Sequence, residues 1–277
     1  MTAATAGVEK SRAWVYIPLT MMALFYLIPM FVMLNTGFKS FDEVSLATMW
    51  NLPSGLSLDN FREAWEALRP NVWNSFKIVI PAATISSFLG SINGYVLSKW
   101  KFRGANVVFP LLLFGMFIPY QSILIPLVQV VSWIGLAGST WALVLVHVIY
   151  GIPITTLIFR NYFAALPESL IEAAKVDGAG IWQVYSRILL PLSIPAFVVV
   201  YIWQFTAAWN DFLFAVLLTS TDNWPVTVAL NNMAGSQIIA WNVQMAGSFL
   251  AALPTLLIYI FLGRYFLRGM MTGALKE

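Results

Sequence analysis

Long apolar segments separated by short polar ones run along almost the whole chain. A helix that crosses the hydrocarbon core of a bilayer needs about 20 mainly apolar residues. By this criterion the sequence predicts six transmembrane helices, which cover residues 14–35, 73–97, 107–131, 139–159, 192–218 and 245–263. The expected fold class is all-α, a polytopic membrane protein with an N-terminal tail, residues 1–13, and a single membrane domain, residues 14–277.

Two parts of this prediction rest on local arguments. The first predicted helix is followed by Asn35-Thr36-Gly37 rather than by the small residues of a cleavage site, so we interpret it as a retained helix and not as a secretory signal. Residues 104–159 contain no Asp, Glu, Lys or Arg, which is too long a segment for one span. Gly135 and Gly138 mark its one convincing break, and they separate the third predicted helix from the fourth.

Lysine and arginine residues assign the polar segments to two sides of the membrane. Eleven of the 15 lie in segments that share a side with both termini. The other four are Lys39, Arg62, Arg69 and Lys77. Because cytoplasmic loops carry an excess of these residues, both termini and residues 164–191 are predicted to be cytoplasmic. Residues 36–72, with a short amphipathic helix at 58–65, and residues 219–244 are predicted to be outer loops.

Composition excludes several other classes of protein. The chain is 60% hydrophobic and only 10% charged, whereas about 25% of the residues of a soluble domain are charged. The net charge of +3 is explained by basic cytoplasmic loops and requires no nucleic acid. There is no cysteine, and no lysine follows a glycine. The first absence rules out a disulfide framework, and the second rules out a GxxxxGK[ST] phosphate-binding loop.

The segment 164–191 is the most informative polar stretch because it lies between two apolar segments. It carries Glu168, Glu172, Lys175, Asp177 and Arg187. Charges are too costly to place in hydrocarbon, so the segment is expected at the water side of the membrane.

The residue types within this segment predict two short helices, at 167–176 and 181–189. Pro167 suits the first helical position, and Gly178 and Gly180 are expected to end the first helix in the left-handed conformation. Ala173 and Ala174 are expected to form a small-residue face for the close approach of another protein. Taken alone, these residues are equally compatible with a linker that lies on the lipid headgroups.

The pattern Glu172-Ala173-Ala174, then Gly178, then Ile188-x-Leu190-Pro191 resembles the EAA loop of ABC importer permeases. Other blocks resemble the carbohydrate-uptake branch of this family, and within it the smaller membrane subunit of maltose transporters. These blocks are Trp73-Asn74-Ser75, Gly94-Tyr95-Val96-Leu97-Ser98, Ile118-Pro119, Trp209-Asn210-Asp211-Phe212 and the segment 269–276. The similarity extends over nearly all of the chain after residue 14. Gly263 departs from it, since relatives often have glutamine there.

The resemblance implies a type I ABC importer permease fold and a chain that is not itself an enzyme. Its EAA loop would dock on a cytoplasmic ATPase that binds ATP and Mg²⁺, and this chain would hold no cofactor of its own. The residues implied in docking are Glu172, Ala173, Ala174, Asp177, Gly178, Ile188, Leu190 and Pro191. The implied assembly has a second, different permease subunit, two ATPase copies and an extracytoplasmic sugar-binding protein, and it lies in the inner membrane of a prokaryote.

Polar residues in the predicted helices are candidates for a substrate path, because a neutral sugar is bound by hydrogen bonds rather than by charges. The candidates are Asn93, Gln121, Gln204, Asn210 and Asp211, with Gln129 as a weaker one. Each of them is also able to bond between helices. Asp211 has either a structural role or a role toward the substrate, and His147 is more often a helix–helix hydrogen-bonding residue than a proton relay.

Two other functions stay open at this stage. An ion-coupled secondary transporter needs coupling residues near the membrane midplane and often has inverted repeats. Here His147 and Asp211 are the only candidates, and we find no internal repeat. A membrane enzyme would need a nucleophile with a base, or a metal cluster. One histidine and no cysteine make that reading the weaker of the two.

Overall fold

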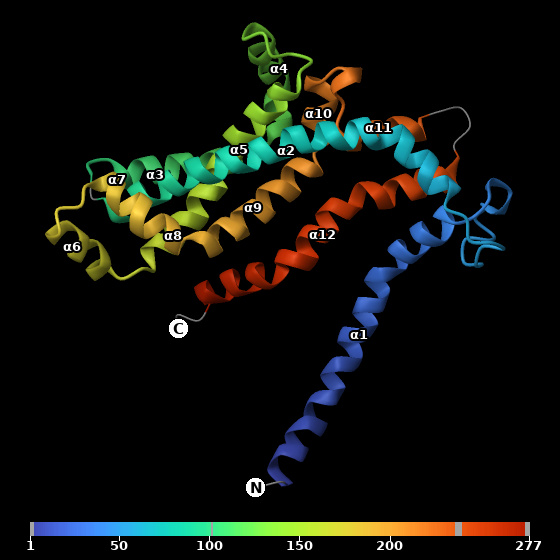
Figure 1. The fold of residues 1–277 in the computed structure, drawn as a ribbon, viewed down its shortest axis with the longest axis horizontal. Coiled ribbons are helices and arrows are strands. Elements are labelled where there is room, and N and C mark those ends of the chain that lie inside the picture. Colours follow the sequence, from blue (N-terminus) through green and yellow to red (C-terminus); the bar gives the residue numbers. More distant parts are fainter. Residues whose placement is uncertain (1–2, 101, 236–239, 275–277) are drawn as a thin grey trace. The chain divides into compact units, whose positions relative to one another are not determined.

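The structure is a computed structural model that describes residues 3–100, 102–235 and 240–274 (Figure 1). Lys101 and Lys276, two of the eleven basic residues assigned to the cytoplasmic side, and residues 236–239 of the predicted outer loop lie outside the described residues. The described chain is helical and contains no named strand, so the all-α prediction is confirmed. Its longer helices are α1 (Ala3–Gly37), α2 (Asp59–Lys99), α3 (Ala105–Phe114), α4 (Leu124–Trp133), α5 (Thr140–Ala164), α9 (Ile194–Trp209) and α12 (Trp241–Ala274).

Shorter helices connect these longer ones. They are α6 (Glu168–Val176), α7 (Ile181–Val184), α8 (Leu190–Leu192), α10 (Leu213–Leu218) and α11 (Val226–Ala234). The 3₁₀ turns are η1 (Phe41–Glu43), η2 (Gly115–Phe117), η3 (Tyr120–Ile123) and η5 (Thr221–Asn223), and η4 (Tyr185–Leu189) is a π turn. Figure 1 shows α6, α7 and α8 gathered beside the C-terminal end of α2.

Within the part of the chain that the structure describes, four helical segments are long and apolar enough to cross a membrane by themselves. They are Trp14–Gly37, Asp59–Lys99, Thr140–Ala164 and Trp241–Tyr265. Two further spans, for a total of six, are obtained if each of two bent helix pairs crosses the membrane once.

The third predicted helix, 107–131, is broken rather than continuous. The axes of Ala105–Phe117 and Tyr120–Trp133 differ in direction by 89°. The break falls at Ile118, which is extended with ψ of 118°. Pro119 follows it, and a residue before proline is disfavoured in the helical conformation because the proline ring collides with its backbone. A single proline thus divides an apolar segment that its composition predicted as one helix.

The fifth predicted helix, 192–218, is divided twice. At Ser193 the chain turns by 75° between Ile181–Leu192 and Ile194–Trp209. The second division separates α9 from α10 at residues 210–212. In both places a polar side chain bonds to the backbone, since Ser193 Oγ donates to the carbonyl oxygen of Leu190 and Asp211 accepts from N–H groups of α10. Such bonds satisfy backbone groups at a helix end.

The predicted outer loop 36–72 is helical from Asp59 onward. The amphipathic helix expected at 58–65 is the first part of α2 and continues through Pro70 into the second span. Ser57 caps its start, because its Oγ accepts a hydrogen bond from the N–H of Asp59 at 3.0 Å. Glutamate, arginine and alanine, all strong helix formers, are frequent in this part of the helix.

The described chain groups into two compact units. Unit 1 contains residues up to Leu68 together with Leu230–Ala252, and unit 2 contains Arg69–Ala229 together with the residues from Leu253 onward. The expectation of a single membrane domain over residues 14–277 stays a prediction. The candidate site lies in unit 2.

In unit 1, hydrogen bonds from buried polar residues hold the segment that follows α1. Lys39 is only 2% exposed, and its Nζ donates to the carbonyl oxygen of Thr48 at 2.7 Å. Asn60 Nδ2 donates to the carbonyl oxygens of Gly37 and Lys39. Hydrogen bonds from Ser54 and from the backbone N–H of Ser40 lower the pKa of Glu43 to about 2. This segment is therefore an ordered structure rather than a flexible loop.

In unit 2, glycines let α2 approach its neighbours closely. A Cβ atom on Gly90 would lie 2.2 Å from Thr155 Oγ1, and one on Gly94 would lie 2.7 Å from both the backbone nitrogen of Arg160 and Phe159 Cβ. On α5, a Cβ on Gly151 would lie 2.0 Å from Gln204 Nε2. Small residues at such positions are typical of membrane helix packing, where backbones come into contact.

Candidate functional site

The segment 164–192 forms a compact helical elbow, and Gly178 makes its central turn. Gly178 has a φ of +80°, in the left-handed region, so the prediction for this residue is confirmed. Its N–H donates to the carbonyl oxygen of Lys175 at 3.0 Å, and the N–H of Ala179 donates to that of Ala174 at 2.9 Å. Together these bonds are the Schellman motif, which satisfies carbonyl groups at a helix end. The prediction for Gly180 is wrong: its φ is −77°, and it precedes the first residue of α7.

The second half of the elbow departs from a regular α-helix. A helix was expected over 181–189, but α7 ends at Val184 and the π turn η4 covers Tyr185–Leu189. Pro191, which directly precedes the fifth predicted helix, lies within α8. Proline has no N–H and so removes the bond to the carbonyl group four residues earlier, here that of Arg187. The loss of this bond immediately after the π turn explains the local change of helix type.

The inner face of the elbow packs against α2, α5 and α9. Its buried residues include Ile171, Ala174, Val184, Tyr185 and Leu189, in one cluster with Tyr95, Phe159, Phe163, Ala196 and Val200. The rings of Tyr95 and Tyr185 stack with centroids 5.7 Å apart. The elbow is therefore attached to three membrane helices through a continuous apolar core.

Hydrogen bonds add specific attachments in both halves of the elbow. Lys99 Nζ donates to the carbonyl oxygen of Leu166 at 2.8 Å, and Tyr95 Oη donates to that of Ile181 at 3.3 Å. Tyr185 Oη lies 3.2 Å from Ser91 Oγ. Lys175 Nζ also lies 5.5 Å from the centre of the Trp100 ring. Displacement of the elbow would thus act on α2 directly.

We expect the pair Tyr185 and Ser91 to contribute to the stability of this attachment. Tyr185→Phe and Ser91→Ala should each lower the midpoint of thermal unfolding in detergent, because each leaves one buried hydroxyl group unpaired. The double variant should lose less than the sum of the two, with a coupling of about 0.5–1.5 kcal/mol, the usual net value of a hydrogen bond. Strictly additive losses would show that the two hydroxyl groups do not interact.

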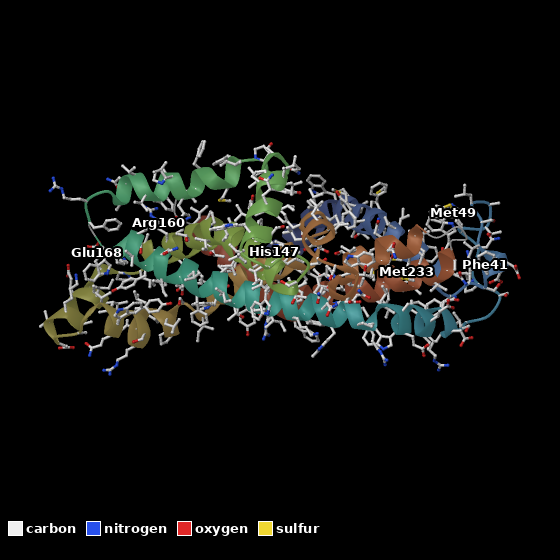
Figure 2. The ribbon with its side chains drawn as sticks, turned by 90° about the horizontal axis from the view of Figure 1, so that it is seen from above. Phe41, Met49, His147, Arg160, Glu168 and Met233 are labelled. Atoms are coloured by element: carbon white, nitrogen blue, oxygen red, sulfur yellow. The ribbon has the colours of Figure 1, made fainter. Side chains whose placement is uncertain are left out.

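The outer face of the elbow is exposed, acidic and partly apolar. Glu172, Ala173 and Asp177 are exposed. Val176 is 87% exposed and Trp182 is 64% exposed. Figure 2 shows Glu168, the first residue of α6, at the end of unit 2 that is away from His147, with Arg160 between these two residues. Exposed apolar residues beside acidic ones are suited to a protein contact.

The structure separates the predicted docking residues by burial. Glu172, Ala173, Asp177, Gly178 and Pro191 are exposed, Ile188 and Leu190 are half-buried, and Ala174 is only 7% exposed. Ala173 and Ala174 therefore do not share the expected small-residue face. Adjacent residues on a helix lie about 100° apart around its axis, so Ala173 faces outward while Ala174 belongs to the inner core.

A polar cluster separate from the elbow lies where α5 meets α9. His147 Nε2 is 3.6 Å from Asp211 Oδ2, which is too long for a hydrogen bond. Gln204 Nε2 donates to Ser86 Oγ at 3.0 Å and to the carbonyl oxygen of His147 at 3.4 Å. His147 and Gln204 are 8% and 4% exposed. This cluster joins α2, α5 and α9 by polar contacts.

Asp211 occupies the break between α9 and α10. Its Oδ2 accepts from the N–H of Ala215 at 3.0 Å, and its Oδ1 accepts from that of Phe214 at 3.4 Å. The Oγ1 of Thr227 donates to its carbonyl oxygen at 2.7 Å. The carboxylate thus caps the first N–H groups of α10. A structural role, one of the two considered from the sequence, is present, and it places the carboxylate beside His147.

The other predicted path residues do not join this cluster. Asn210, which directly follows α9, is exposed and donates to the carbonyl oxygen of Thr206 in that helix, and Gln121 is exposed on η3. Asn93 is half-buried on α2, seven residues beyond Ser86, which is about 10 Å along a helix. Only Gln204 and Asp211 therefore come together, and they do so around His147.

Two residues near this cluster were not among the sequence candidates. Tyr150 and Trp203 line the same cavity as His147 and Gln204. Tyr150 is three residues after His147 on α5, and Trp203 directly precedes Gln204. The spacing of three residues places side chains on one face of a helix and was available as a signal in the sequence. Among the described residues, no group of three or more His, Asp or Glu side chains is placed to hold a metal ion.

Comparison with known proteins places the chain among importer subunits. Residues 85–271 match the family described as binding-protein-dependent transport system inner membrane component. A probable ABC transporter permease protein of Pyrococcus horikoshii is 44% identical over 271 residues, which cover 97% of this chain and 98% of that protein. A xylose/arabinose import permease protein of Haloferax volcanii is 36% identical and covers 90% of this chain and 89% of its own length.

A solved structure has the same fold. It is that of a bacterial ABC transporter involved in the import of the acidic polysaccharide alginate, with a TM-score of 0.79 and 20% identity, covering 96% of this chain and 99% of that one. The expected importer permease fold is thereby confirmed. The family match also decides against the two alternative functions considered from the sequence, an ion-coupled transporter and a membrane enzyme. The chain belongs to the binding-protein-dependent inner-membrane transport components, the permease subunits of ABC importers.

Proposed function

We propose that this permease subunit carries a sugar through an ATP-driven importer and is coupled to the ATPase through the elbow at residues 164–192. The sugar is supported by the relative from Haloferax volcanii, which is named for the import of xylose and arabinose. The coupling role is supported above all by one observation: the elbow has an exposed acidic and apolar outer face and an inner face packed against α2, α5 and α9.

Membership in the family implies an ABC ATPase and a binding protein as partners. The finer assembly is part of the proposal: a second and different permease subunit, two ATPase copies, and ATP with Mg²⁺ bound by the ATPase alone. We also place both termini and the elbow on the cytoplasmic side of a prokaryotic inner membrane, because lysine and arginine are concentrated in those segments.

In this proposal the elbow transmits movement of the ATPase pair to the membrane helices. The buried rings of Tyr95, Phe163 and Tyr185 and the bond from Lys99 to Leu166 join the elbow to α2 and α5. Close-packed interiors change between discrete arrangements instead of deforming gradually. A shift of the elbow would therefore be passed to the helices beside the substrate path rather than absorbed at the contact.

Charge reversal at Glu172 tests the docking role. Glu172→Lys should leave the chain inserted but reduce co-purification of the ATPase and sugar uptake by about tenfold or more, since the loss of a well-placed contact in an interface costs about 1–2 kcal/mol. Glu66→Lys, the same change at an exposed residue of unit 1, is the matched control and should behave as wild type. Full uptake and full ATPase recovery with Glu172→Lys would remove Glu172 from the docking surface.

A further inference from the structure

A cavity of about 230 Å³ opens beside the polar cluster of unit 2. Its lining includes His147 and Tyr150 of α5, Trp203 and Gln204 of α9, and Met116 of η2. This volume is below the roughly 300–1,000 Å³ of pockets for drug-sized ligands. The cavity therefore suits a small ligand of about one sugar ring. Its lining holds no carboxylate, lysine or arginine, which favours a neutral ligand.

The polar side of this cavity has unused hydrogen-bonding capacity. Within the described residues, His147 Nε2 and Tyr150 Oη are buried and have no hydrogen-bond partner. Buried polar atoms are almost always paired, and one left unpaired costs about 1–3 kcal/mol. His147 and Tyr150 both line this cavity, and each carries one such atom, which points to a ligand that pairs them in another state of the transport cycle.

The surroundings of His147 hold its ring in place. Asp211 Oδ2 lies 3.6 Å from Nε2, and the Phe214 ring is edge-on at 6.2 Å. Gln204 bonds to the His147 carbonyl oxygen and to Ser86 on α2. The polar groups of the cavity are thus positioned by contacts from three helices, as a specific binding site requires.

The other side of the cavity is aromatic. Trp203 is 48% exposed and Met116 is 45% exposed, so the indole ring is available for a contact. A sugar ring has apolar C–H faces and hydroxyl groups at its edge. An aromatic face next to hydrogen-bonding groups, with no charged side chain in the lining, matches that chemistry.

We propose that the cavity lined by His147, Tyr150, Trp203 and Gln204 is a subsite for one neutral sugar ring on this chain. Trp203 stacks against the ring, while Tyr150 Oη and His147 Nε2 bond to its hydroxyl groups. Both polar atoms are covered in this conformation, so the ring reaches them when α5 and α9 separate during transport. This inference rests on the proposed sugar import and adds the residues that hold the sugar.

The test uses the complete importer, with its ATPase and binding protein, in proteoliposomes and with labelled D-xylose, L-arabinose and D-glucose as probes. Uptake and ATP hydrolysis are measured per inserted permease. Tyr150→Phe removes only a hydroxyl group that has no partner, and Trp203→Leu removes the stacking face. Tyr16→Phe and Trp133→Leu, at side chains that are 64% and 88% exposed, are the matched controls.

We expect Tyr150→Phe and Trp203→Leu to lower sugar uptake about fivefold to tenfold, while ATP hydrolysis stimulated by the loaded binding protein is retained. The number of sugars moved per ATP should fall in these two variants and stay constant in the controls.

A ratio of sugars to ATP equal to wild type in both pocket variants overturns the subsite but leaves sugar import intact. If the wild-type importer takes up none of the three sugars, the import of a single-ring sugar, on which the subsite rests, fails. If Trp203→Leu lowers only the amount of inserted protein, Tyr150→Phe decides the result.

Discussion

Replacing Gly178 with proline is expected to abolish sugar uptake while the chain still inserts into the membrane. Proline fixes φ near −65° and has no N–H, whereas residue 178 has a φ of +80° and donates to the carbonyl oxygen of Lys175. The variant cannot form the turn that ends α6, so the exposed side chains of Glu172 and Asp177 would no longer be held together on the proposed docking surface. Uptake in proteoliposomes and co-purification of the ATPase would measure both effects.

Two alanine variants make this prediction specific to the left-handed turn. In Gly178→Ala the new Cβ meets no atom within 4 Å, so the cost comes from the backbone alone. That cost is about 1–2 kcal/mol for a residue with a side chain in the left-handed region. Gly180→Ala is the matched control, since φ at this position is −77°. We expect near-normal uptake from Gly180→Ala, reduced uptake from Gly178→Ala and none from Gly178→Pro.

A different order of effects would contradict the proposed role of the elbow. If Gly178→Pro transports as well as wild type, the turn at Gly178 is not needed for coupling. If Gly178→Pro retains the ATPase but loses uptake, the elbow transmits movement without being the main docking contact. Equal losses in the two alanine variants would show that residue 180 is as sensitive as residue 178, against the backbone argument.

Gly94→Ala is expected to destabilise the helical core of unit 2. The added methyl group would lie 2.7 Å from the backbone nitrogen of Arg160 and from Phe159 Cβ, and 2.9 Å from the Phe159 carbonyl carbon. Real Cβ atoms do not approach backbone atoms so closely, so α2 and α5 must move apart. Overpacking of this kind costs typically about 1–3 kcal/mol. The measurement is the midpoint of thermal unfolding in detergent.

Gly263→Ala is the matched control, because it also replaces a helical glycine in unit 2 but its Cβ would meet nothing within 4 Å. Alanine is the better helix former by about 1 kcal/mol, so this variant should be neutral or slightly more stable. The same midpoint for Gly94→Ala and Gly263→Ala would show that α2 and α5 are not in the close contact described.

Much of the fold was predictable because it depends on local properties of the chain. A run of about 20 apolar residues forms a helix wherever it lies in a bilayer, since every backbone group must be paired. The all-α class and the helical character of the six segments followed from this rule. The helix at Glu168–Val176 and the left-handed turn at Gly178 followed from proline and glycine chemistry, and the EAA pattern indicated the family.

The places where the helices break were not predicted, because apolar composition does not report them. Ile118 takes its extended conformation from the proline that follows, whereas at the turn the side chain of Ser193 bonds to the backbone. Both kinds of signal occur elsewhere in this chain without a break, as Pro70 and Ser86, both within α2, show. Which of them interrupts a helix depends on the neighbours that can pair the released backbone groups.

The sequence by itself therefore determined the class of protein, its helical segments and the elbow with its glycine turn. Only the tertiary structure decided that Ala174 is buried while Ala173 is exposed, and that Asp211 lies beside His147 rather than beside Asn93 or Gln121. The physical reason is that burial and pairing depend on contacts between helices far apart in the chain. The cavity bordered by Tyr150 and Trp203 exists only because α5 and α9 pack together.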